Sequence, residues 1–162
     1  IYYDLASEQE SEEEYLQFLN NAVSSFYHAK LLLENEDLVT LSEKELYSEM
    51  WYKYLRSKSY ADYRIYEELD NSMIDEIDNL CKFNEEHFGD KDYKTSCSYY
   101  LKALFNKDKD PVLSYEYNMK CALLFSEIEY ENEVLDNYSL NSPIDLYAGK
   151  WALIAYNDIM SS

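Results

Sequence analysis

Glycine and proline are almost absent from this chain, which contains only two of each among its 162 residues. Average protein sequences contain roughly 12% of the two together. Folds made of many strands need tight turns, and tight turns depend on Gly, Pro, Asn and Asp. β-sandwiches, barrels and doubly wound sheets are therefore close to excluded, and an all-α fold of few, long helices is predicted. The length suits one domain, residues 1–162, with a sizeable core.

The charge balance limits the partners of such a domain. Acidic residues outnumber basic ones by 33 to 14, which gives a formal net charge of −19. A general nucleic-acid binder presents a basic face to phosphates, so no nucleic-acid partner is expected. An anionic partner would need a local basic patch, whereas the bulk of the surface would attract cationic partners. The hydrophobic fraction of 47% is too high for a disordered acidic tail.

Targeting signals and cysteines favour an intracellular, cytoplasmic protein. No apolar run approaches the roughly 20 residues of a membrane-spanning helix, so no membrane partner is expected. The first residues are acidic, which is not typical of a signal peptide. The three cysteines have no paired spacing, and their odd number favours reduced thiols.

Helix start and stop signals divide the chain into about seven helices. Ser11 is followed three residues later by Glu14, and Ser42 by Glu45, and both pairs are typical of a capping box at a helix N-terminus. The predicted helices cover residues 2–10, 11–34, 42–69, 72–87, 93–106, 111–135 and 143–160.

Two further patterns support this division. Asp110-Pro111 and Ser142-Pro143 each place an N-cap acceptor before a proline, which the first position of a helix tolerates well. The third predicted helix carries an apolar stripe with a period of 3.6 residues, which predicts a face directed to the core. Its members are Tyr47, Met50, Trp51, Tyr54, Ala61, Ile65 and Leu69.

Motifs for catalysis or metal binding are missing from the sequence. His28 and His87 lack the Glu three residues earlier that di-iron helical bundles use. The cysteines and histidines are too scattered for a zinc site, and no Gly-rich phosphate loop occurs. We therefore expect neither an enzyme nor a bound metal or cofactor.

One basic cluster stands out against the acidic background. Lys53, Arg56, Lys58 and Arg64 are four of the 14 basic residues and fall within 12 positions. At about 100° per residue, Lys53, Tyr60 and Arg64 lie within about 40° of one another, and Arg56 lies within about 60° of Lys53. Two interpretations stay open: salt bridges to the abundant Glu and Asp, or a site at which a rigid helix binds a phosphate.

The same helix resembles the third helix of the 14-3-3 family. Tyr52-Lys53 and Tyr63-Arg64-Ile65 match that family's Tyr-Lys and Trp-Arg-Ile at the same spacing. Near the end of the chain, residues 142–146 and 156–160 are similar to two segments of the family's seventh helix. Weaker similarities follow the same order at residues 1–9, 76–81 and 100–101. The chain thus resembles a divergent 14-3-3 protein, which implies an antiparallel helical array that lacks the family's last two helices.

The resemblance implies an adaptor that binds phosphoserine or phosphothreonine in partner proteins. It also implies a homodimer, in which the first two helices pack on the third and fourth helices of the partner. The phosphate-binding positions of the family that are kept here are Lys53, Arg64 and Tyr100.

Other binding positions of the family carry different residues here. The first third-helix Arg falls on Tyr60, the fifth-helix Arg on Tyr99 and the peptide-binding Asn on Trp151. Arg56 lies about one turn before Tyr60, and we expect it to replace part of the missing Arg. The phosphate site is thus atypical. An alternative function is an acidic helical protein that has lost phosphopeptide recognition and binds basic or unphosphorylated partners.

Overall fold

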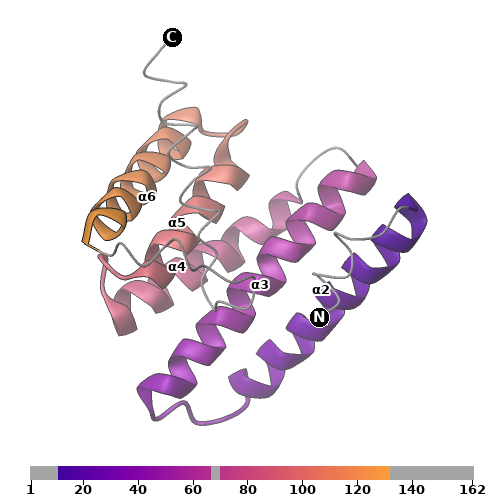
Figure 1. Cartoon of the computed structure of the whole chain (residues 1–162), viewed down its shortest axis with the longest axis horizontal. Helices are drawn as coiled ribbons and strands as arrows, with labels where there is room; N and C mark the ends of the chain where they lie inside the picture. Colours follow the sequence, from indigo (N-terminus) through magenta and orange to yellow (C-terminus); the bar gives the residue numbers. More distant parts are fainter. Residues whose placement is uncertain (1–10, 67–69, 132–162) are drawn as a thin grey trace. The chain divides into compact units, whose positions relative to one another are not determined.

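The computed structural model describes residues 11–66 and 70–131, and within them the all-α prediction is confirmed. The predicted helices 2–10 and 143–160 lie outside the described residues. The chain divides into two compact units with the boundary after Met73, and each unit is described by itself. None of the helices in these two ranges is long and apolar enough to cross a membrane. The helices are α2 (Glu12–Glu34), α3 (Leu41–Tyr66), the short 3₁₀ helix η1 (Asn71–Met73), α4 (Ile74–Phe88), α5 (Tyr93–Asn106) and α6 (Pro111–Glu131) (Figure 1).

Helix starts agree with the sequence at most positions. Ser11 caps α2, and its side chain accepts a hydrogen bond from the backbone N–H of Glu14 at 3.5 Å. Pro111 is the first residue of α6, and the Asp110 carboxylate accepts from the N–H of Leu113 at 3.0 Å. Both N-cap predictions are confirmed, because a short polar side chain here satisfies a backbone donor that the helix leaves without a partner.

The predicted capping box at Ser42 and Glu45 is wrong. Helix α3 begins at Leu41, and Thr40 Oγ1 accepts from the N–H of Glu43 at 3.2 Å. The Glu43 carboxylate accepts in return from the N–H groups of Thr40 and Val39, at 2.8 and 3.0 Å. The same pattern of hydroxyl and carboxylate therefore operates two residues earlier, where one Glu satisfies two backbone donors.

The first unit contains an antiparallel pair, α2 and α3, which lie side by side (Figure 1). The Tyr27 and Tyr54 rings lie 5.0 Å apart, and Lys30 Nζ lies 5.0 Å from the centre of the Trp51 ring. In these contacts a higher residue number on α2 pairs with a lower residue number on α3, so the two helices are antiparallel. Leu19 and Ala61 form the buried centre of a cluster with Tyr15, Phe18, Val23 and Tyr60.

The predicted apolar stripe of α3 is confirmed where its side chains are described. Tyr47, Trp51 and Ala61 are buried, whereas Met50 and Tyr54 are half-buried. The side chains of Ile65 and Leu69 lie outside the described residues. The stripe therefore fixes which face of α3 turns toward the interior of the protein.

The second unit is a three-helix layer with α5 in the middle. Asn84 of α4 donates to the backbone carbonyl of Lys94 at 3.0 Å, and Lys102 pairs with Asp78 of α4 at 3.0 Å. These contacts make α4 and α5 antiparallel. Gly89 ends the turn after α4 with a φ of +85°, a conformation that side chains disfavour.

Helix α6 packs antiparallel on α5 at a short distance. Ser96 Oγ donates to the backbone carbonyl of Cys121 at 3.4 Å, and Ser114 Oγ donates to the carbonyl of Ala103 at 2.8 Å. All five residues from Thr95 to Tyr99 are buried, so α5 is covered around its whole circumference there. Small side chains on α5 let the two backbones approach closely enough for these hydrogen bonds.

Candidate functional site

Helix α3 carries three of the five predicted phosphate-binding residues with described side chains: Lys53, Arg56 and Tyr60. Their spacings of three, four and seven residues place them on neighbouring turns of one helix face. The helix is long and packs against α2. Its backbone is therefore a rigid support for these side chains.

Lys53 already has an anionic neighbour. Its ammonium lies 2.8 Å from Glu49 Oε1, one turn earlier, and 5.9 Å from the centre of the Phe26 ring. Both side chains of the ion pair are partly exposed, at 31% for Lys53 and 18% for Glu49. The pair is therefore solvated enough for another anion to reach the Lys53 ammonium and compete with Glu49.

Arg56 and Tyr60 form the most closely joined pair of the site. Arg56 Nη2 donates to the Tyr60 hydroxyl oxygen at 2.5 Å. The guanidinium carbon lies 4.2 Å from the centre of the same ring. Arg56 is 7% exposed and Tyr60 is half-buried, so a buried guanidinium lies beside a more exposed phenol ring. A guanidinium can only donate, and the hydroxyl hydrogen of Tyr60 therefore points away from Arg56.

Two buried serines support this part of α3. Ser57 Oγ donates to the carbonyl of Lys53 at 2.7 Å, and Ser59 Oγ donates to the carbonyl of Arg56 at 2.6 Å. Both hydroxyls are thereby satisfied within the helix. Because serine is small and uncharged, the two residues fit into the buried surroundings of α3 without adding a charge there.

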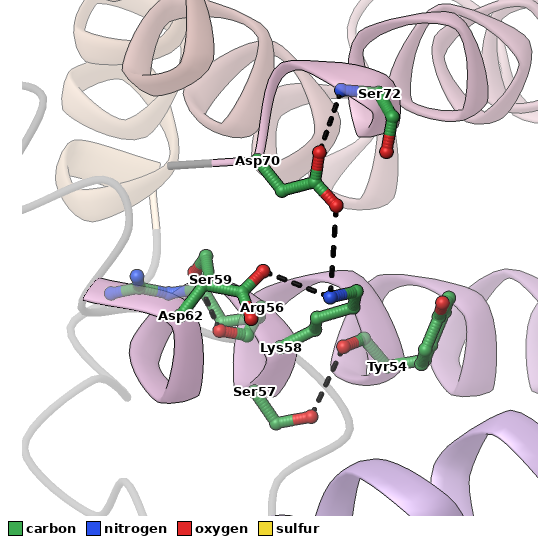
Figure 2. Close-up of polar contacts among 8 residues, drawn as sticks. All are labelled: Tyr54, Arg56, Ser57, Lys58, Ser59, Asp62, Asp70 and Ser72. Atoms are coloured by element: carbon green, nitrogen blue, oxygen red, sulfur yellow. Dashed lines mark hydrogen bonds and ion pairs between the residues drawn. The ribbon is translucent and has the colours of Figure 1, made fainter. Parts of the chain in front are cut away.

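Lys58, the remaining member of the basic cluster, binds two carboxylates. Figure 2 shows its ammonium between Asp62, at 2.9 Å, and Asp70, at 3.9 Å. Asp70 also accepts from the N–H of Ser72 at 2.9 Å. Hydrogen bonds from Ser72 and the nearby Lys58 charge lower the pKa of Asp70, so it is ionised at neutral pH. Lys53 and Lys58 thus both make the ion pairs that the salt-bridge interpretation expects, and the phosphate-site interpretation stays a prediction.

The structure describes the other two predicted residues, Arg64 and Tyr100, in less detail. Arg64 belongs to α3, but its side chain lies outside the described residues. Tyr100 is half-buried on α5 and belongs to the second unit, so its position is described only within that unit. The structure thus brings together Lys53, Arg56 and Tyr60, and the participation of Arg64 and Tyr100 stays a prediction.

Tyr99, which the resemblance to the 14-3-3 family aligns with an Arg, makes its contacts inside the second unit. Its hydroxyl donates to Glu85 of α4 at 2.6 Å, and its ring lies 5.2 Å from that of Tyr117. Burial and the hydrogen bond to the Glu85 carboxylate raise the pKa of Tyr99. Tyr99 therefore stays protonated and holds α4 to α5. Trp151 lies outside the described residues.

Glu49, Asp62 and Asp70 are the residues of the site that the sequence analysis missed, and each lies beside a lysine of the basic cluster. The spacing of four residues between Glu49 and Lys53 is a signal that could have identified the first pair. No local signal connects Lys58 with Asp70, which lies 12 positions later. Among the residues that the structure describes, no group of three His, Cys, Asp or Glu side chains could hold a metal ion.

Comparisons with known proteins give no relative for this chain. No protein-family model matches the sequence, and no curated protein and no solved structure matches it either. The resemblance to the 14-3-3 family therefore rests on the sequence motifs alone.

Proposed function

We propose that this chain is an intracellular, 14-3-3-like adaptor that binds phosphoserine- or phosphothreonine-containing segments of other proteins. The phosphate would contact Lys53, Arg56 and Tyr60 of α3, together with Arg64 and Tyr100. The observation that carries the proposal is the Arg56–Tyr60 pair, joined at 2.5 Å one turn after Lys53. It puts a buried positive charge beside a phenol, at the position that the resemblance aligns with an Arg of the family.

Tyr60 would be the group that donates to the phosphate. Because Arg56 already donates to the phenol oxygen, the Tyr60 hydrogen is directed to another acceptor. A charged donor on the oxygen polarises the O–H bond and strengthens it as a donor. Arg56 would then act through Tyr60 as a positioning residue and would also contribute its charge. This arrangement replaces one bidentate Arg by an Arg–Tyr relay.

Lys53 would supply the direct charge. A partly exposed ion pair within one helix, such as Lys53–Glu49, contributes about 0–1 kcal/mol. A hydrogen bond from a charged group to phosphate contributes about 1.5–3 kcal/mol. A phosphate with a charge near −2 therefore competes well with Glu49. The net charge of −19 does not prevent this, because the Debye length is about 8 Å at physiological salt.

The test is a calorimetric titration with a phosphoserine peptide and its unphosphorylated twin at about 150 mM salt. We expect tighter binding of the phosphopeptide, and loss of that preference in Lys53→Glu. The control is Lys82→Glu, which makes the same charge change at an exposed lysine of α4 and should keep the preference. Tyr60→Phe should weaken phosphopeptide binding by about tenfold, which equals about 1.4 kcal/mol. Equal affinity for both peptides in the unmodified protein would contradict the proposal.

The homodimer is part of the same proposal. In it, the first two helices of one copy pack on the third and fourth helices of the other. Light scattering at micromolar concentration should give twice the chain mass. A monomer at that concentration would contradict the homodimer. It would not test the phosphate site, which the calorimetric titration tests separately.

A second candidate function is an acidic adaptor that binds basic, unphosphorylated partners. It is favoured by the ion pairs that Lys53 and Lys58 already make with Glu49 and Asp62. Binding of this kind should weaken steadily as salt increases, because each contact is a screened charge pair. It should also be indifferent to the phosphate on the peptide. The same pair of peptides, titrated at two salt concentrations, therefore distinguishes the two functions.

A further inference from the structure

Helix α6 lies on the outside of the second unit, beside α5 (Figure 1), and carries an apolar stripe on its outer side. The stripe consists of Val112, Tyr115, Met119 and Leu123, and we call it the α6 stripe. Their spacings of three, seven and eleven residues keep all four side chains within about 80° of helix circumference. Val112 is 77% exposed and Leu123 is 56% exposed, whereas the two residues between them are half-buried.

The opposite side of α6 is the one that packs on α5. Ser114 and Cys121 are buried there, and Ser114 Oγ donates to the carbonyl of Ala103 on α5 at 2.8 Å. Both residues lie about 160–180° around the helix from Val112. Helix α6 therefore has buried residues on one side and exposed apolar residues on the other. Apolar residues on two sides are typical of a helix that packs against two neighbours.

The chain itself contains a segment that fits the α6 stripe. Residues 143–160, the last predicted helix, carry an apolar stripe with the same helical period. Its members are Ile144, Ala148, Trp151, Ala155 and Ile159. Only three residues of this segment are charged, although the chain as a whole has a charge of −19. Contact between the two stripes would remove apolar surface of both from water, which is favourable.

The link between α6 and this segment is long enough for the chain to fold back on α6. Helix α6 ends at Glu131, about 12 Å beyond Leu123 at 1.5 Å per residue. Residues 132–142 can span about 36 Å when extended. A tether of this length gives the segment a local concentration on the order of millimolar at the α6 stripe. The attached segment therefore has an advantage over any free partner.

We propose that the α6 stripe binds residues 143–160 of the same chain, antiparallel to α6. Trp151, in the middle of the segment's stripe, would then be buried against α6. The resemblance to the 14-3-3 family aligns Trp151 with a peptide-binding Asn, and the inference gives this position a packing role in place of a peptide contact. It involves neither the phosphate-binding residues of α3 nor the helices of the proposed homodimer, so it does not rest on the proposed function.

The test follows Trp151 by fluorine NMR in the full chain labelled with fluorotryptophan. The chain has two tryptophans, so two signals are expected, and Trp151→Phe identifies which one belongs to Trp151. The double variant Val112→Gln/Leu123→Gln makes the α6 stripe polar. It should shift the Trp151 signal toward its position in the urea-unfolded protein and leave the Trp51 signal in place.

The matched control is Val39→Gln/Leu41→Gln. It makes the same two changes at residues of the first unit that are 78% and 59% exposed. Both tryptophan signals should stay where they are in the original protein, because these residues do not belong to the α6 stripe.

A spin label distinguishes the chain's own segment from that of a second copy. The native cysteines are buried, so a nitroxide reagent should react with the exposed variant Lys120→Cys, beside the α6 stripe. The label should broaden the Trp151 signal of its own chain. In a mixture of spin-labelled chains without fluorine and fluorinated chains without the label, the signal should stay sharp.

Three results would overturn the proposal. The first is a Trp151 signal that neither the double variant of the α6 stripe shifts nor the spin label broadens. The second is an equal shift of that signal in the matched control. The third is broadening in the mixture, because a second copy would then cover the α6 stripe. None of these measurements uses a phosphopeptide, so their failure is distinct from a failure of the proposed function.

Discussion

Helices α3 and α5 both bury polar side chains, but they satisfy them in different ways. On α3, in the first unit, the buried Ser59 donates to the carbonyl of Arg56 in the same helix at 2.6 Å. On α5, in the second unit, Ser96 donates across to Cys121 of α6 at 3.4 Å. The buried hydroxyl of Ser59 is therefore satisfied within α3, whereas that of Ser96 helps to join α5 to α6.

This difference shows which contacts fix the packing of the helices in each unit. In the first unit, helix-to-helix contacts are made by aromatic rings, such as Tyr27 with Tyr54. Rings tolerate small shifts of one helix along another, because their attraction has a broad geometry. In the second unit, hydrogen bonds between helices fix the register, because a serine that misses its carbonyl leaves buried polar groups unsatisfied. We therefore expect substitutions that change side-chain shape to destabilise α5 more than α3. Substitutions that remove an aromatic ring should destabilise α3 more than α5.

The largest expected effect is the loss of the Trp51 ring. Trp51 is 7% exposed, lies 5.3 Å from the Tyr47 ring and carries the Lys30 ammonium at 5.0 Å. Trp51→Ala should lower the free energy of unfolding by about 3–5 kcal/mol, measured by urea unfolding with circular dichroism. Leu46→Ala, at an exposed position of the same helix, should change it by less than about 0.5 kcal/mol. Similar effects of both variants would mean that the aromatic contacts do not stabilise this unit.

The next effect should come from overpacking the close approach of α5 and α6. Ser96 is fully buried, and a leucine at its position would collide with the Cys121 backbone. Ser96→Leu should destabilise the second unit by about 1–3 kcal/mol. Ser25→Leu, the same change at an exposed position of α2, should be tolerated.

The reactivity of the three cysteines reports on the packing of the second unit, because all three belong to it. Cys81, Cys97 and Cys121 are buried. Burial raises the pKa of Cys81 to about 12, which keeps this thiol protonated. Thiol labelling of the folded protein should therefore be very slow, and Ser96→Leu should accelerate it by about 5- to 150-fold. Unchanged labelling would contradict the close packing of α5 on α6.

Much of the fold could be predicted from local chemistry. Scarce Gly and Pro predicted helices, and the N-caps at Ser11 and Asp110 were located correctly because each is a short-range backbone interaction. The start of α3 was misplaced because Thr40–Glu43 and Ser42–Glu45 have the same pattern. Only the backbone geometry distinguishes them, since Glu43 reaches two N–H groups at once.

The candidate site could be predicted only in part. The helical period placed Lys53, Arg56 and Tyr60 on one face of α3. The hydrogen bond from Arg56 to Tyr60 follows the same spacing of four residues. The contact between Lys58 and Asp70 could not be predicted, because it depends on how the chain turns after α3. Sequence periodicity describes a helix face well but does not describe the segment that folds back on it.

A smaller effect tests the corrected start of α3. Thr40→Ala removes the hydroxyl that accepts from Glu43, and it should lower the free energy of unfolding by about 1 kcal/mol. Ser42→Ala changes an exposed residue inside the first turn, where Ala is the better helix former. It should be neutral or slightly stabilising. The opposite order of the two variants in urea unfolding would restore the capping box at Ser42 and Glu45.

The smallest expected effect is the pH dependence of the same cap. Hydrogen bonds from the Thr40 backbone and hydroxyl and from the Val39 backbone lower the pKa of Glu43 below its ordinary value of 4.5. A pKa that is lowered on folding stabilises the protein above pH 4.5, and this stabilisation is lost as the pH falls through the lowered pKa. The NMR shift of the Thr40 amide should therefore titrate with a midpoint below 4.5. Glu43→Gln should remove that titration, and it should also remove the part of the stability that the original protein loses in this pH range. A midpoint at or above 4.5 would show that the carboxylate does not bind the two amides in solution.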